Sequence, residues 1–211
     1  MDAFIRSDQY NFIKEKTSDL LHAHSSVNDT GVMNALKSMT QEKSVGLFKN
    51  LDQVQSGLVN QIQQVEDQAD AVLFLSRLKQ YVIPFPELSE DELKQLFPKV
   101  KKLHVPDLSK VNHLELSYLG WNDLNSNRKY IVFQKAGNIA GLSGAFTPSR
   151  QPGICSICNG LEKVGMFTAT THRSSQGTVK RGNYICKDSS VCNQNLIELD
   201  SFAAFVNRMK G

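Results

Sequence analysis

Four cysteines, all in the last third of the chain, constrain its fold more than any other feature. Cys155 and Cys158 form a C-x₂-C pair, and Cys186 and Cys192 form a second pair after a gap of 27 residues. Two local pairs of thiolates can close tetrahedral coordination on one Zn²⁺ ion. Because four thiolates leave no open position for water, we expect these residues to hold one structural zinc ion.

The sequence around the cysteines predicts how each pair approaches the metal. A Pro-Gly dipeptide precedes the first pair and an Asn-Gly dipeptide follows it, which favours the tight turn of a zinc knuckle. Apolar residues after the second pair recur at helical spacing and predict a helix over residues 189–209. We therefore place Cys186 at a strand end and Cys192 in the first helical turn, an arrangement like that of a treble clef.

Three other interpretations of the cysteines are weaker. A disulfide framework is disfavoured because the cysteines are clustered in a chain of 211 residues that shows no secretory leader over residues 1–6. A redox C-x-x-C motif lacks its usual βαβ context here and leaves the second pair unexplained. A catalytic zinc needs an open coordination position, which four thiolates fill.

Composition indicates two modest domains with different charge. No apolar run approaches 18 residues, so we expect no transmembrane helix, and without a leader the cytoplasm is the expected location. Residues 1–83 carry 8 Lys and Arg against 10 Asp and Glu, whereas residues 84–211 carry 16 against 11. This positive excess is small for a nucleic-acid-binding domain, and it permits either RNA or an acidic protein as partner.

The predicted fold class is α+β, with a four-helix bundle over residues 1–83 and a zinc-binding α/β domain over residues 84–211. Apolar residues recur at intervals of three and four in four segments of the first domain, at residues 5–21, 32–39, 47–58 and 65–73. Pro84 and Pro86 end the bundle because proline cannot continue a helix. Ser89 and Glu92 then form a capping-box pattern that begins a short helix.

The second domain is predicted to contain a small antiparallel sheet. Strands are indicated over residues 114–118, 130–133 and 139–146 by alternation and by β-branched and aromatic residues. We interpret residues 120–130 as a polar loop that Trp121, the only tryptophan, anchors in the core.

A second polar stretch, residues 168–183, separates the cysteine pairs and is interpreted as a long loop. It carries Arg173, Lys180 and Arg181 among Ser, Gly and Thr. Because recognition residues concentrate in loops held by a rigid scaffold, we expect partner contacts here.

Several stretches of this sequence resemble the fusidic acid resistance proteins of staphylococci. They are GWNDLNSNRKY at residues 120–130, ICSICN at 154–159, GNYIC at 182–186, QYN at 9–11 and YVIPF at 81–85. The match extends along nearly the whole chain and is more specific than a zinc pattern alone.

The resemblance implies a small cytoplasmic protein that binds elongation factor G. Its zinc domain would dock on the C-terminal domains of the factor and release the factor from ribosomes on which fusidic acid has trapped it. The ribosome would then be an indirect partner, and neither membrane nor direct drug binding is expected. No nucleophile with a base, paired carboxylates or phosphate loop is evident in the sequence, so we do not expect an enzyme.

The same resemblance implies partner contacts at Ile154, Arg181, Tyr184 and Phe205, to which the basic stretch adds Lys180. An arginine and an aromatic residue around a metal-fixed corner are good interface anchors. The alternative is that Tyr184 and Phe205 cover the core of the small domain.

Two functions of other classes stay open at this point. An RNA-binding zinc module acting on the ribosome would show a steep loss of affinity with salt. An enzyme acting on the drug would change the mass of the drug.

Overall fold

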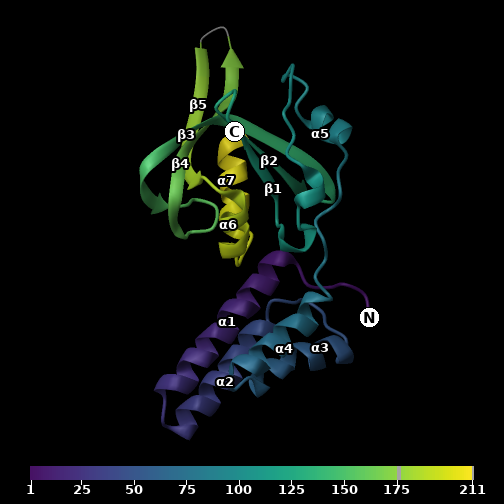
Figure 1. The fold of residues 1–211 in the computed structure, drawn as a ribbon, viewed down its shortest axis with the longest axis vertical. Helices are drawn as coiled ribbons and strands as arrows, with labels where there is room; N and C mark the ends of the chain where they lie inside the picture. Colours follow the sequence, from purple (N-terminus) through teal and green to yellow (C-terminus); the bar gives the residue numbers. More distant parts are fainter. Residues whose placement is uncertain (175–176, 211) are drawn as a thin grey trace. The chain divides into compact units, whose positions relative to one another are not determined.

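The computed structural model describes residues 1–174 and 177–210, which belong to two compact units, Met1–Ile83 and Pro84–Gly211 (Figure 1). The first unit is built from helices: α1 (Ser7–Ser26), α2 (Thr30–Val45), α3 (Gln53–Asn60), the 3₁₀ helix η1 (Gln61–Gln64) and α4 (Gln68–Lys79).

Aspartates begin three of the four α-helices in this unit. The side chains of Asp29, Asp52 and Asp67 accept hydrogen bonds from backbone N–H groups in the first turns of α2, α3 and α4. Such caps satisfy donors that have no partner inside the helix. The third predicted helix, over residues 47–58, therefore starts later than expected, because Asp52 caps it at Gln53.

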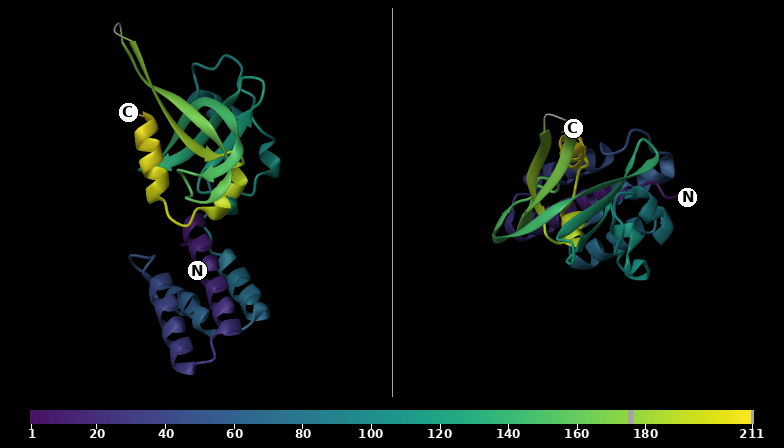
Figure 2. Two further views of the ribbon diagram at one scale, coloured as in Figure 1. Left: turned by 90° about the vertical axis from the view of Figure 1, so that its left-hand side faces the viewer. Right: turned by 90° about the horizontal axis from the view of Figure 1, so that it is seen from above.

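The second unit combines a sheet with short helices. Its elements are α5 (Glu90–Leu96), η2 (Leu108–Lys110), η3 (His113–Glu115), β1 (Leu119–Asp123), β2 (Arg128–Lys135), β3 (Asn138–Ile154), β4 (Leu161–Ser174), β5 (Gly177–Cys186), α6 (Ser189–Asn195) and α7 (Asp200–Lys210). The strands form one sheet in the order β1-β2-β3-β4-β5, each antiparallel to the next (Figure 2).

Four expectations for this unit are wrong. Residues 120–130 are not a loop, since β1 and β2 pair here and only residues 124–127 lie between them. Residues 114–118 are not a strand, because β1 starts at Leu119 and places Trp121 opposite Tyr130, where the two rings stack 5.1 Å apart. Residues 168–183 are not a loop, since they belong to the paired strands β4 and β5, apart from residues 175–176, which lie outside the described residues. The helix expected over residues 189–209 is two helices, α6 and α7.

A separate hydrophobic core lies on each face of the sheet. Because side chains alternate along β2, Ile131 and Phe133 join a core with α7 on one face, and Tyr130 and Val132 join a core with α5 on the other. The first core includes the four cysteines, and α7 packs on β4 and β5 (Figure 2). The metal centre therefore belongs to the α7 face.

None of the helices in the described residues has the length and apolar character needed to cross a membrane.

Candidate metal centre and partner-binding residues

Four cysteines from different elements meet inside the second unit. Cys155 and Cys158 lie in the turn between β3 and β4, Cys186 ends β5, and Cys192 lies in α6. All four are buried, and their sulfur atoms lie within 4.8 Å of one another. The Cys155–Cys192 and Cys158–Cys186 sulfur pairs are each 3.7 Å apart. A tetrahedron with zinc–sulfur bonds of about 2.3 Å has edges of about 3.8 Å, so this spacing fits one zinc ion.

The turn that carries the first pair is arranged around the Cys155 sulfur. The backbone N–H groups of Ile157 and Cys186 both donate to that sulfur, at 3.3 Å. Asn159 takes a left-handed conformation, φ 59°, and Cys155 N–H donates to the Gly160 carbonyl. Backbone donors aimed at sulfur stabilise a thiolate, and an Asn tolerates the left-handed turn that brings the chain back.

The pKa values of the four thiols also favour a cation between the sulfur atoms. Hydrogen bonding from Cys158 and the other two cysteines holds the pKa of Cys155 well below its usual range. Hydrogen bonding with the other three cysteines raises the pKa of Cys192, and Cys155 has the largest effect. One metal ion removes this conflict because all four cysteines can then be deprotonated, so zinc binding is expected to release protons.

A buried lysine lies beside this centre. Lys129 is 0% exposed, and its Nζ donates to the Lys187 carbonyl at 3.0 Å and to the Asn122 side-chain oxygen at 3.3 Å. Burial lowers the pKa of Lys129 to about 8, while the negative charges of Cys192 and Cys186 act in the opposite direction. A zinc ion with four thiolates is a net anion, so a nearby ammonium group offsets part of its charge. The surroundings therefore fit a zinc–tetrathiolate centre.

Asn193, next to the last cysteine, fixes α6 to the chain that enters β1. Its side-chain oxygen accepts from the N–H groups of Ser117 and Tyr118, at 2.7 and 3.2 Å. Its amide nitrogen donates to the carbonyls of Tyr118 and Ser189, each at 2.9 Å. One amide thus satisfies buried backbone groups on two separate segments.

We expect Asn193→Ala to lower the free energy of unfolding by about 3 kcal/mol, because buried backbone groups lose their partners. Urea denaturation followed by Trp121 fluorescence measures this change. Gln194→Ala is the matched control, since Gln194 is the exposed neighbour on the same helix. Equal and small losses in both variants would contradict the role of Asn193.

Comparisons with known proteins agree with this geometry. The family described as "Elongation factor G-binding protein, N-terminal" matches residues 4–86, and the family described as "FBP C-terminal treble-clef zinc-finger" matches residues 98–207, more than half of the chain. The chain belongs to the elongation factor G-binding, fusidic acid resistance protein family. The predicted family, fold class and single structural zinc are confirmed.

A solved structure of the family matches over the whole length. It is described as "Structure of the fusidic acid resistance protein FusC" and is 33% identical, with a TM-score of 0.86, over 99% of this chain and 98% of that one. The comparison with curated proteins returned no match.

The partner contacts expected from the family differ in exposure. Ile154 is 60% exposed and Tyr184 is 48% exposed. Lys180 and Arg181 are also on the surface. Phe205 is only 2% exposed and lies in the core against Phe167, with ring centroids 5.7 Å apart. Direct contact between Phe205 and a partner does not fit this burial, which favours the alternative, that Phe205 covers the core.

Arg181 and Tyr184 do not lie on the same face of β5. Residues 181 and 184 are three apart on a strand, so their side chains point to opposite sides. Arg181 is on the α7 side, where its Nη1 donates to the Arg208 carbonyl near the end of that helix, at 3.0 Å. Tyr184 is on the other side, as is Lys180. The side chain of Arg173, the third basic residue of this stretch, is outside the described residues.

One exposed residue near the zinc turn was not expected from the sequence. Leu161, 70% exposed, is the register partner of Ile154 across the β3–β4 pair. Ser156, inside the zinc turn, donates its N–H to the Tyr184 carbonyl at 2.9 Å. We call Ile154, Leu161 and Tyr184 the apolar corner. A leucine directly after Asn-Gly gave the only sequence signal for its exposure.

Proposed function

We propose that this protein binds elongation factor G through the apolar corner of its zinc-containing unit and releases the factor from ribosomes stalled by fusidic acid. The observation that carries the proposal is the exposure of Ile154, Leu161 and Tyr184 on backbone that the four-cysteine centre fixes. Aromatic and aliphatic side chains held by a rigid support are the usual energetic centre of a protein interface.

The physical basis of release is a difference in affinity. A second protein ends a drug-stabilised complex only if it binds the released or rearranged factor more tightly than the trapped one. A preorganised corner favours such binding because little conformational entropy is lost on docking. The proposed contact surface on the factor is its C-terminal domains, and the ribosome is affected through the factor.

This mechanism needs no chemistry on the drug. We propose that the protein is not an enzyme and does not bind fusidic acid, and that it acts in the cytoplasm, where translation takes place. The four-cysteine centre supports a structural metal, because four sulfur ligands fill the coordination shell. Unchanged drug mass after incubation with the protein is the expected result.

The apolar corner gives a direct test of the partner. In calorimetric titrations with purified elongation factor G, Ile154→Ala and Tyr184→Ala should each weaken binding by about 2 kcal/mol, roughly 30-fold in Kd. Leu124→Ala is the control, because Leu124 is 84% exposed in the turn between β1 and β2. Its affinity should equal that of the parent protein.

Two outcomes would reject this assignment. If the parent protein gives no heat with the factor, the proposed partner is wrong. If Ile154→Ala, Tyr184→Ala and Leu124→Ala all bind elongation factor G equally well, the proposed partner is correct and the proposed surface is wrong. Arg181→Ala is unsuitable for this test because it also removes the hydrogen bond to α7.

A further inference from the structure

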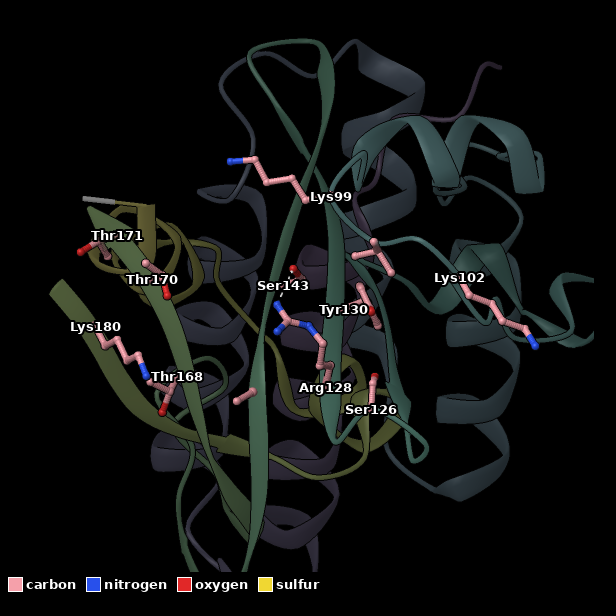
Figure 3. Close-up of a pocket in the computed structure, with 12 residues that line it drawn as sticks. Lys99, Lys102, Ser126, Arg128, Tyr130, Ser143, Thr168, Thr170, Thr171 and Lys180 are labelled. Atoms are coloured by element: carbon pink, nitrogen blue, oxygen red, sulfur yellow. Dashed lines mark hydrogen bonds between the residues drawn. The ribbon is translucent and has the colours of Figure 1, made fainter. Parts of the chain in front are cut away.

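A hollow of about 860 Å³ lies over the sheet on the face opposite the metal centre (Figure 3). Its floor is formed by β2, β3, β4 and β5, and the segment after α5 supplies one wall with Lys99 and Val100. Neither the zinc centre nor the apolar corner uses this hollow.

The hollow exists because small residues occupy the middle of the sheet. The register places Arg128 opposite Ala145, Ala145 opposite Thr168, and Thr168 opposite Gly182. In the next row, Thr170 faces Lys180. Small side chains in the middle strands leave room between the long cationic side chains of β2 and β5, which lie three strand spacings, about 14 Å, apart.

The charge in the hollow is unbalanced. Lys99, Lys102, Arg128 and Lys180 line it, and none of its described lining residues is acidic. Among the described residues, none of these four cations forms an ion pair. In Figure 3, Arg128 lies near the centre with its guanidinium toward Ser143, Lys180 runs along β5 toward Thr168, and Lys102 points away from them. Arg128 and Lys180 are therefore the cations best placed to meet a ligand on the floor.

Two polar groups in the hollow lack a partner. Among the described residues, neither Arg128 Nε nor the Tyr130 hydroxyl has a hydrogen-bond partner, although both atoms are buried. Toward the part of the chain that the structure describes, the Arg128 guanidinium makes one hydrogen bond, from Nη2 to the Ser143 hydroxyl at 3.2 Å. Buried donors without acceptors are rare in folded proteins. The Tyr130 hydroxyl is closed to solvent, so the half-buried Arg128 is the residue through which an acceptor from outside the chain would be bound.

The surrounding groups specify the chemistry of that acceptor. Arginine, lysine and Ser/Thr hydroxyls are the side chains that contact phosphate and sugar oxygens in nucleic-acid complexes. A docking site for a protein would present exposed apolar or aromatic residues at its centre, and here the aromatic residue, Tyr130, is 0% exposed. We propose that this hollow binds the phosphodiester backbone of single-stranded RNA without reading its bases.

A strand of RNA fits the hollow better than a free nucleotide does. The described lining residues include neither an acid to hold magnesium nor a glycine-rich loop at a helix start, which are the usual features of nucleoside triphosphate sites. The cations are spread over several strands, as successive phosphates require. Because the only aromatic ring among the described lining residues, Tyr130, is buried, the hollow itself offers no stacking platform, so contacts to the backbone dominate and sequence preference is weak. This proposal does not depend on binding to elongation factor G.

The test measures fluorescence anisotropy of a labelled oligouridylate of about 12 nucleotides with the full-length, zinc-loaded protein. Arg128→Gln/Lys180→Gln should weaken binding at least tenfold at about 50 mM salt. The slope of log K against log salt should become shallower by about 1.4, since each phosphate contact with a single strand contributes about −0.7 to this slope. Lys180→Gln alone, at an exposed site, should make the slope shallower by about half as much.

Lys101→Gln/Lys163→Gln is the matched control, because it removes two exposed lysines of the same unit outside the hollow. Its affinity should stay within about twofold of the parent value. Equal losses in both double variants, or no binding by the parent protein at low salt, would overturn the proposal. Displacement of RNA by equimolar ATP or inorganic phosphate would also overturn it, by identifying a small-anion site instead.

Discussion

Cys192→Ser should unfold the second unit and abolish binding to elongation factor G. Apparent zinc-binding free energies in small domains are about 10–16 kcal/mol, which is as large as the whole stability of a typical domain. Cys192 joins α6 to the zinc turn, so its loss also separates that helix from β3 and β5. Chelation of zinc from the parent protein should have the same effect.

Trp121 fluorescence reports this loss specifically, because the only tryptophan of the chain lies in the core of the second unit. Its emission should shift to the red in Cys192→Ser and after chelation, and zinc content should fall to zero by metal analysis. Ser156→Ala, inside the same turn but without a sulfur ligand, is the control and should keep both its zinc and its fluorescence. A folded, factor-binding Cys192→Ser protein would show that the metal is dispensable.

Phe205→Ala should destabilise the second unit by about 3–5 kcal/mol, the usual effect of removing a buried aromatic ring. Phe205 lies against Phe167 in the core shared by α7 and the sheet. Its effect on factor binding should therefore follow from stability: binding is lost where the unit unfolds and is retained at temperatures where it stays folded.

Phe205→Leu separates the two roles of this residue. A leucine keeps most of the apolar volume, so stability should change by less than about 1.5 kcal/mol. If Phe205 only fills the core, calorimetric affinity for elongation factor G should be unchanged in this variant. A large loss of affinity with normal thermal stability would instead show that the ring reaches the partner.

Local signals predicted the features that depend on neighbouring residues. The capping box of Ser89 and Glu92 and the knuckle around Cys155 each involve contacts within a few positions. The metal site was predictable for the same reason, because each cysteine pair is short and the donor set is chemically distinctive. Membership of the family rested on longer matches.

Features set by pairing between distant segments were not predictable. Residues 114–118 alternate like a strand, yet the strand begins at Leu119, where Trp121 can stack on Tyr130. The polar stretch over residues 168–183 offers few apolar residues, and its pairing in β4 and β5 depends on neighbouring strands. Helical periodicity did not show that both phenylalanines of α7, Phe202 and Phe205, are buried, since that depends on the sheet beneath them.

Lys129 and its neighbours on β2 connect the two faces of the sheet. Lys129 points toward the metal centre and holds the Lys187 carbonyl, while Arg128 and Tyr130 line the hollow on the other face. A one-residue insertion or deletion within β2 would exchange these positions, placing a hydroxyl or guanidinium beside the thiolates and the buried lysine over the hollow. Insertions and deletions among homologues should therefore occur in the turns at either end of β2 and not within the strand itself.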